Sequence, residues 1–144
     1  MGNLYDYFAA SSDEQAATAL QSPTVTNFPV VALKRIDPTI HLNRAEALLT
    51  ATDYDTVSAN PRSEHLIAEL DESIWVTTLT DELPDALASA GETHRRAVAE
   101  LWARSEEFDG DIDPADLLPV VDELADLARQ AKAAGDRLYC RTCL

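Results

Sequence analysis

The sequence predicts one α+β domain in which three or four short strands pack against four or five helices. Short runs of β-branched and aromatic residues, of which Ile74 to Leu79 is the strongest, are typical of strands. Longer runs with apolar residues at helical spacing, bounded by capping residues, are typical of helices. With 144 residues, 46% of them hydrophobic, the chain can bury a core without a metal or a disulfide.

The first part of the chain begins with a predicted strand and a predicted helix. Leu4 to Phe8 is largely aromatic and predicts a strand that stops before Ser11. Ser12 can cap a helix, and Gln15 three residues later completes a capping box. Pro23 is expected to end that helix.

A second strand and a second helix follow. Val30 to Leu33 is apolar and β-branched, which favours a strand. Asp37 is an acid at a cap position and Pro38 stands at the first helical position, where its missing N–H costs no hydrogen bond. The buried side of this helix is predicted to carry Ile40, Ala45, Leu48 and Leu49.

The middle of the chain has weaker signals. Residues 51–62 have the composition of a loop, and His65 to Leu70 predicts a short helical turn. The strand Ile74 to Leu79 comes next.

Three helices and a terminal strand are predicted for the rest. The helix from Asp81 to Ala90 is closed by Gly91, and a second runs from Thr93 to Glu107. The longest begins at Asp113-Pro114 and stops at Gly135, which we expect in a left-handed conformation. Leu138 to Cys140 then returns as a strand.

The charge balance is the most unusual property of the chain. It has 26 Asp and Glu against 11 Lys and Arg, a formal charge of −15. Such a field repels nucleic acid and anionic lipid surfaces and attracts basic proteins. We therefore expect a basic protein partner, no nucleic acid and no membrane. A GC-rich or salt-adapted source would account for the same acidity, and this explanation stands beside the functional one.

The sequence also favours a cytoplasmic location. No stretch approaches the roughly 20 apolar residues of a membrane span. Met1 to Ala10 lacks the lysines and the long apolar run of a secretion signal.

Cys140 and Cys143 form a C-x-x-C pair, the spacing that lets two thiolates reach one zinc. A structural zinc needs four ligands, and the three histidines are scattered singly. A redox role needs the first cysteine at a helix start, whereas this pair lies on a predicted strand, where its side chains face opposite ways. We expect a buried Cys140 and an incidental Cys143, and no metal.

The remaining motifs give no catalytic residue and no cofactor. Asp109 to Asp113 resembles a calcium loop, but Pro114 and Val120 stand where that motif needs glycine and glutamate. Glu106 and Glu107 are neighbours on a helix and face different ways, so they are expected to be solvated charges rather than an acid–base pair. The four glycines stand alone and make no phosphate loop.

Trp75 and Trp102 are large anchors. A tryptophan on a strand among β-branched residues, or beside Leu101 on an amphipathic helix, is usually part of a core. A partner-binding hot spot is the alternative for either residue.

A resemblance spans nearly the whole chain. It is carried by Met1 to Phe8, Ile36 to Pro38, Ala47 to Thr50, Trp75 to Thr77, Arg104 to Phe108 and Leu138 to Cys140. These stretches resemble a family of small, uncharacterised bacterial proteins from GC-rich genomes. The Met-Gly-aromatic start is more distantly similar to the YfbM-like family, which has no assigned activity. The resemblance implies one α+β domain in an intracellular setting and transfers no catalytic residue; Cys143 lies outside the family pattern.

The function that these observations favour is a non-enzymatic cytoplasmic interaction protein. It would be an accessory or inhibitory factor that presents an acidic surface to a basic partner. The alternative is a small enzyme or ligand-binding domain with an unrecognised pocket. An acidic convex face would favour the first hypothesis, and a deep cleft with converging polar groups the second.

Overall fold

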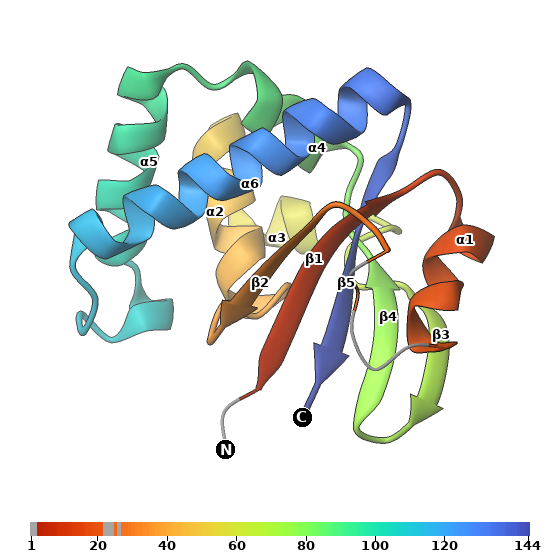
Figure 1. Cartoon of the computed structure of the whole chain (residues 1–144). Coiled ribbons are helices and arrows are strands. Elements are labelled where there is room, and N and C mark those ends of the chain that lie inside the picture. The colour runs from red at the N-terminus through yellow and green to blue at the C-terminus, as the bar shows by residue number, and fades with distance from the viewer. Residues whose placement is uncertain (1–2, 22–24, 26) are drawn as a thin grey trace.

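The sheet brings the first and last strands of the chain side by side (Figure 1). The computed structural model describes residues 3–21, 25 and 27–144. Within them five strands form one antiparallel sheet in the order β2-β1-β5-β4-β3. The strands are β1 (Leu4–Ala10), β2 (Val30–Lys34), β3 (Leu66–Asp71), β4 (Ile74–Thr78) and β5 (Arg137–Cys143).

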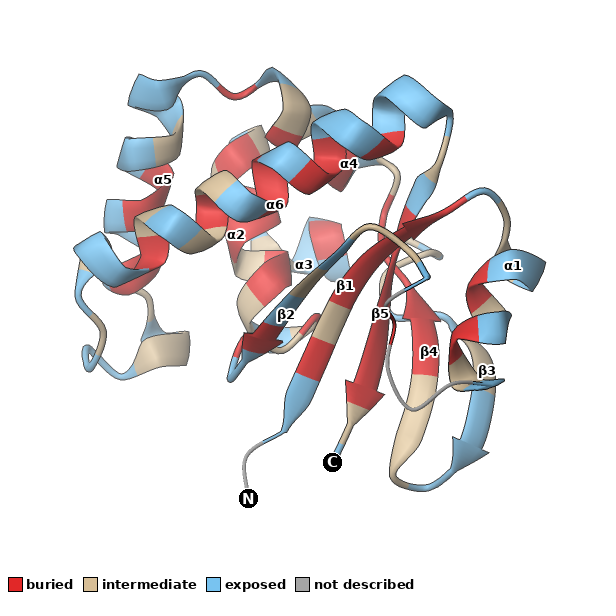
Figure 2. Cartoon of the chain, viewed as in Figure 1, coloured by how far each residue is buried: buried red, intermediate tan, exposed pale blue. Residues whose placement is uncertain are grey.

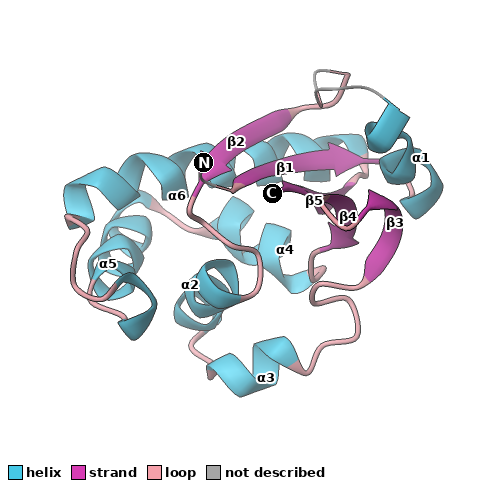
Figure 3. Cartoon of the chain, turned by 90° about the horizontal axis from the view of Figure 1, so that it is seen from below, coloured by secondary structure: helices cyan, strands magenta, loops and turns pink. Residues whose placement is uncertain are grey.

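Helices cover both faces of this sheet (Figures 1 and 3). The larger group, α2, α4, α5 and α6, packs on one face, and α1 with the 3₁₀ helix η1 packs on the other. The short α3 packs against α2. The helices are α1 (Asp13–Ala17), η1 (Thr18–Gln21), α2 (Ile40–Thr50), α3 (Tyr54–Ser58), α4 (Glu82–Ser89), α5 (Glu92–Ala103), the 3₁₀ helix η2 (Glu106–Phe108) and α6 (Pro114–Ala134).

The larger core lies between the sheet and the α2, α4, α5 and α6 group (Figure 2). Alternation along the strands sends Tyr7 and Leu138 to this face, and the apolar stripe of α6 meets them with Leu117 and Leu124. Trp102 is fully buried among them. Each such side chain contributes about 1.5–3 kcal/mol through removal from water, so this core fixes α6 across the sheet.

A smaller core lies on the opposite face. Phe8 and Tyr139 come from neighbouring strands, and their ring centroids are 5.7 Å apart. Phe28 packs on Phe8 at 5.1 Å, and Ala16 of α1 closes the cluster. Ala16 is the buried residue of α1, and its small side chain allows this short helix to approach the sheet.

Most of the predicted elements are confirmed. The strands expected from Leu4, Val30 and Ile74 are β1, β2 and β4, and the terminal strand is β5. Ser12 caps α1 by accepting a hydrogen bond from the amide of Gln15 at 3.1 Å. Residue Pro23, the predicted end of this first helix, lies outside the described residues.

The second helix begins later than predicted and exposes one predicted core residue. It starts at Ile40 with Thr39 at the N-cap position, so Pro38 lies in the turn before the helix rather than at its first position. The carboxylate of Asp37 accepts hydrogen bonds from the amides of Thr39 and Ile40, at 2.7 and 2.8 Å. Ala45 and Leu49 are buried as predicted. Ile40, the first residue of the helix, is 51% exposed and does not contribute to the core.

The predicted numbers of strands and helices were too low, since the described residues contain five strands and six α-helices. The segment predicted as a helical turn, His65 to Leu70, forms strand β3 instead. Its alanine, glutamate and leucines favour a helix locally, but pairing with β4 decides its conformation. The predicted loop 51–62 contains α3, whose cap Asp53 accepts a hydrogen bond from the amide of Thr56 at 2.8 Å.

Two glycines behave differently from each other. Gly135 ends α6 with φ of 73°, as predicted for a left-handed cap. Gly91 has φ of −75° and begins α5 rather than closing α4 in a left-handed turn. Helix α5 ends at Ala103, earlier than the predicted Glu107, and the chain then turns through η2.

Candidate functional site

Most of the cationic side chains are engaged within the protein. Seven of the 11 Lys and Arg residues form ion pairs among the described residues, and these pairs engage seven carboxylates out of 26. The other carboxylates belong to none of these eight ion pairs of the described residues. Two regions show the contrast, a polar cluster around Arg62 and a stretch of carboxylates before α6.

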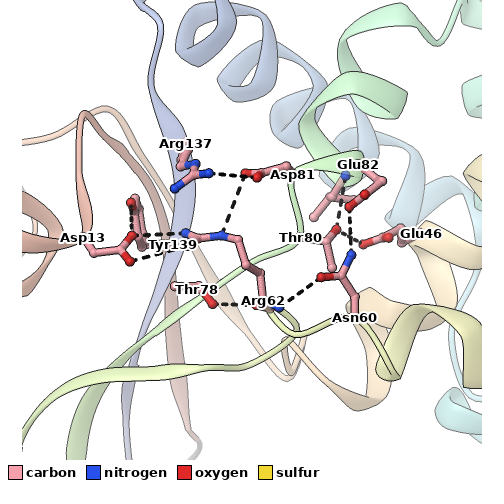
Figure 4. Close-up of polar contacts among 11 residues, drawn as sticks. Asp13, Glu46, Asn60, Arg62, Thr78, Thr80, Asp81, Glu82, Arg137 and Tyr139 are labelled. Carbon is pink, nitrogen blue, oxygen red and sulfur yellow. Dashed lines mark hydrogen bonds and ion pairs between the residues drawn. The ribbon is translucent and has the colours of Figure 1, made fainter.

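The first region, which we call the Arg62 cluster, consists of Asp13, Arg62, Asp81, Arg137 and Tyr139 (Figure 4). Two guanidinium nitrogens of Arg62 donate to Asp13 at 3.2 and 3.4 Å, and the Tyr139 hydroxyl donates to Asp13 at 2.7 Å. Arg137 donates to Asp81 at 3.1 Å. The cluster thus ties α1, β5 and the start of α4 to the segment before β3.

The electrostatics of the Arg62 cluster fit a structural role. Hydrogen bonds from Arg62 and then from Tyr139 lower the pKa of Asp13. Burial lowers the pKa of Arg62, but its hydrogen bonds to Asp13 outweigh burial and raise it. Burial, followed by the contact with Asp13, raises the pKa of the Tyr139 hydroxyl. Each group is held in its ordinary charge state, which stabilises contacts and supplies no group poised for proton transfer.

A buried carboxyl group lies beside this cluster. Glu46 of α2 is 4% exposed and accepts a hydrogen bond of 2.5 Å from the Thr80 hydroxyl (Figure 4). Burial raises the pKa of Glu46, although the Thr80 bond partly opposes this. The amide of Leu83 donates to the same Thr80 oxygen, so Thr80 links α2 to the first turn of α4.

The second region, which we call the acidic segment, is residues 106–116. It contains six carboxylates and no Lys or Arg. Five of them are exposed, and only Glu107 takes part in an ion pair in the described structure. Figure 1 places the segment between α5 and α6, at the end of the molecule away from α1 and the β3–β4 hairpin.

Local structure turns these carboxylates outward. The backbone is left-handed at Asp109, with φ of 53°, and at Gly110, with φ of 72°, so the chain reverses directly after η2. Asp113 then caps α6 by accepting a hydrogen bond from the amide of Ala115 at 2.9 Å. Asp116 lies in the first turn, where the helix dipole favours a negative charge.

Phe108 and His41 anchor the segment to the core. The Phe108 ring packs on His41 at 4.7 Å and on Trp102 at 5.5 Å. His41 Nδ1 accepts from the amide of Asp37 at 3.1 Å, so Nε2 carries the proton and donates to the Glu107 carbonyl at 3.2 Å. Both nitrogens of His41 are therefore occupied, and this residue is a structural link rather than a free base.

Glu107 is the half-buried member of the segment. Its carboxylate pairs with Arg44 of α2 at 3.0 Å, which corrects the prediction that Glu106 and Glu107 are both solvated. Burial raises the pKa of Glu107, but hydrogen bonds from its own amide and from Arg44 outweigh burial and lower it. Its second oxygen is buried without a hydrogen-bond partner among the described residues.

A cavity of about 450 Å³ lies against the acidic segment. One wall is the end of β2 and the turn after it, and the other is formed by residues 107–116. Its charged lining combines two cations with four carboxylates, and its apolar lining comes from the same two walls. The charged residues are Lys34, Arg35, Glu107, Asp109, Asp111 and Asp116, and the apolar ones are Ile36, Phe108 and Ile112.

The cations of this cavity are available for an outside partner. Neither Lys34 nor Arg35 belongs to an ion pair in the part of the chain that the structure describes. Arg35 has a φ of 69°, a left-handed conformation that a bulky side chain rarely adopts. The turn after β2 places Arg35 at the cavity and is retained despite this cost.

The cysteines and tryptophans singled out in the sequence do not come together at this site. Cys140 is buried in the larger core on β5, and burial raises its pKa; Cys143, half-buried on the same strand, is also a free thiol. Trp102 is fully buried and donates from Nε1 to the His41 carbonyl at 3.0 Å, so it supports the site from the core. Trp75 is only half-buried on β4, opposite Thr142.

Sequence reasoning missed the cations of both regions. Arg62 stands in a stretch that was interpreted as a loop, and its partners are 49 residues earlier in α1 and 77 residues later in β5. Lys34 and Arg35 directly follow the strand predicted at Val30 to Leu33, and no sequence pattern singles them out. The six carboxylates of the acidic segment are visible in the sequence, but the calcium-loop and acid–base patterns do not indicate that they face a cavity together.

Among the described residues there is no group of three or more His, Cys, Asp or Glu side chains placed to hold a metal ion. None of the described helices combines the length and hydrophobicity that crossing a membrane requires. No family model, curated protein or solved structure matches this chain.

Proposed function

We propose that this protein is a non-enzymatic cytoplasmic interaction protein that binds a basic protein partner through the acidic segment. The observation that carries the proposal is that five of the six carboxylates of residues 106–116 are exposed and belong to no ion pair in the described structure. The cations of the Arg62 cluster, by contrast, are used within the protein. A basic partner would supply positive charges, which the segment itself lacks.

The rigidity of the segment supports this role. Phe108 packs against His41 and Trp102, and Asp113 caps a helix of 21 residues, so the carboxylates project from an ordered frame. A preorganised surface loses less entropy on binding than a disordered acidic tail. The two free thiols are in keeping with the reducing cytoplasm.

The test is binding of a basic, C-terminally amidated peptide, followed by fluorescence anisotropy. The variant Asp109→Asn/Asp111→Asn/Asp116→Asn removes three charges from the segment and keeps the Asp113 cap. We expect its affinity for the peptide to fall at least tenfold. The wild-type affinity should also fall steeply as salt rises.

A matched control removes the same number of charges elsewhere. Glu14, Glu69 and Glu72 are exposed on α1, β3 and the β3–β4 turn, and the described structure gives their side chains no hydrogen bond or ion pair. The variant Glu14→Gln/Glu69→Gln/Glu72→Gln should lose no more than about threefold in affinity. Equal losses in both variants would show that the total charge acts rather than the acidic segment, and would overturn the proposal.

The cavity favours a second candidate, a ligand-binding domain. Its volume of about 450 Å³ is in the roughly 300–1,000 Å³ range of small-molecule sites, and polar groups of both signs converge on it.

A further inference from the structure

We infer that the cavity beside the acidic segment binds a small linear molecule with a cationic amine or guanidinium at one end and a carboxylate at the other. Lysine, arginine and ω-amino carboxylates belong to this class. The inference extends the second candidate function and does not require a protein partner.

The charges of the lining select for both ends of such a ligand. Asp109, Asp111 and Asp116 lie on one side and form no ion pair in the described structure, so they can receive a cation. Lys34 and Arg35 lie on the other wall and are likewise without ion pairs, so they can receive a carboxylate. A plain cation would meet repulsion from Lys34 and Arg35, and a plain anion would meet the carboxylates.

The apolar part of the lining selects for what joins the two ends. Ile36 belongs to the cationic wall, while Phe108 and Ile112 belong to the acidic wall. An aliphatic chain of several carbons can cover these side chains and remove their surface from water, which favours binding. The cavity thus fits a molecule that is charged at both ends and apolar between them.

The neighbouring polar side chains are engaged elsewhere and do not neutralise the charges of the cavity. His41 is held by two hydrogen bonds, and Glu107 is engaged by Arg44, so neither moves to neutralise the free charges.

The experiment uses 6-aminohexanoate as the probe, with hexan-1-amine and hexanoate as one-ended controls, in calorimetric and ¹H–¹⁵N NMR titrations of the whole chain. We expect saturable binding of 6-aminohexanoate, with shifts at Phe108 and Ile112. Each one-ended control should bind at least tenfold more weakly. Absence of saturable binding, or an amine that binds as well as the two-ended probe, would overturn the inference.

Variants test the two walls separately. Asp116→Asn and Arg35→Gln should each weaken 6-aminohexanoate at least fivefold. Arg104→Gln, an exposed cation outside this cavity, and Glu123→Gln, an exposed acid further along α6, should leave the affinity within twofold. These are surface substitutions, and thermal melts will verify that each variant is folded. Equal effects at Arg35 and Arg104 would overturn the inference.

Two sources could supply this ligand chemistry, a free amino acid or the C-terminal lysine of a peptide. A short peptide with a free C-terminal lysine is compared with its amidated form and with free lysine. Tighter binding of the free-acid peptide than of lysine points to a chain terminus, and the reverse points to a metabolite; both support the inference. Equal binding of the two peptide forms, without binding of free lysine, would overturn it.

Failure of the cavity inference can be distinguished from failure of the proposed function. The amidated basic peptide has no carboxylate end for Lys34 and Arg35 to bind, so it tests the acidic segment without the cationic wall of the cavity. If it binds while 6-aminohexanoate does not, the cavity inference fails and the protein-partner proposal stands. If only 6-aminohexanoate binds, the opposite holds.

Discussion

The Arg62 cluster and the acidic segment lie at opposite ends of the molecule and handle charge in opposite ways. Around Arg62, two arginines meet two aspartates, and a buried tyrosine completes the coordination of Asp13. In the acidic segment, six carboxylates stand within 11 residues and Arg44 pairs with one of them. The charges of the Arg62 cluster hold elements together, whereas most carboxylates of the acidic segment belong to no ion pair within the described structure.

The difference follows from where each region lies in the fold. The Arg62 cluster joins segments that are far apart in the chain, since Tyr139 and Asp13 are separated by 126 positions. Losing a partner there leaves a partly buried charge unsatisfied. The acidic segment is continuous in sequence, and its outward side chains remain in water. Asp113, Asp116 and Glu107 have roles in the fold as helix cap, first-turn acid and partner of Arg44. Glu106, Asp109 and Asp111 have no such role among the described residues, so the fold does not explain why these three are also acidic.

The largest expected effect comes from breaking the Arg62 cluster. Arg62→Met should lower the free energy of unfolding by about 2–3 kcal/mol, because Asp13 and Asp81 both lose a contact and Tyr139 loses its stacked cation. Urea unfolding measures the change.

Arg104→Met is the control for this variant. Arg104 is exposed and makes no ion pair within the described residues, so its loss should be within about 0.5 kcal/mol. Similar losses at Arg62 and Arg104 would mean that the cluster adds nothing beyond surface charge.

The next effect concerns α6, which connects the two regions. This helix begins in the acidic segment, and two residues separate its end from β5. The test asks whether a change at the end of α6 alters binding at the acidic segment. Gly135→Val should cost about 1–2 kcal/mol, because a β-branched residue fits poorly at φ of 73°. Under conditions in which this variant stays folded, its affinity for the basic peptide should equal that of the wild type. Gly91→Ser, at a φ of −75° that any residue adopts, should change stability by less than about 0.5 kcal/mol.

A third prediction separates two carboxyl groups by pH. The pKa of Glu46 is raised in the folded state, so its favourable contribution exists at low pH and is lost as pH rises through the folded pKa. Glu46→Gln should therefore be more stable than wild type at pH 7, by about 1 kcal/mol, and the gain should vanish below about pH 4.

Asp13 should respond with the opposite sign. Its pKa is lowered in the folded state, so its contribution is present at neutral pH and is lost as pH falls through that pKa. Asp13→Asn should be less stable than wild type at pH 7 and should converge with it in acid. Stability curves with the same sign for both variants would contradict the assignment of their environments.

The contrast between the two regions also marks how far the sequence could predict this structure. Ser12, Asp37, Asp113 and Gly135 act through neighbours within a few residues, so their capping roles were readable. The longest helix was recognised because its apolar spacing persists over many turns. β3 was missed because its conformation depends on β4 and not on its own residues.

The candidate site was predictable only in part, for the same reason. The acidic segment is contiguous, so its charge could be seen in the sequence, but whether those charges were paired could not. Lys34 and Arg35 reach the cavity from another part of the chain, some 70 to 80 positions before its acidic wall. Nothing near them in sequence indicates such a neighbour.

The smallest expected effect concerns salt. Unpaired carboxylates crowd together in the folded state and repel one another, and the screening length shrinks from about 30 Å at 0.01 M salt to about 10 Å at 0.1 M. The melting temperature should rise over this range by a few degrees, equivalent to about 1 kcal/mol.

The two triple variants locate that repulsion. The Asp109→Asn/Asp111→Asn/Asp116→Asn variant and the Glu14→Gln/Glu69→Gln/Glu72→Gln variant each remove three negative charges, so total charge alone predicts the same salt response for both. Crowding within the acidic segment predicts a smaller rise in melting temperature for the first variant than for the second. Chloride and sulfate should agree in direction at low concentration, where screening dominates. A melting temperature that is flat or falls with salt would mean that the carboxylates are dispersed, and a basic partner would then have no concentrated charge to recognise.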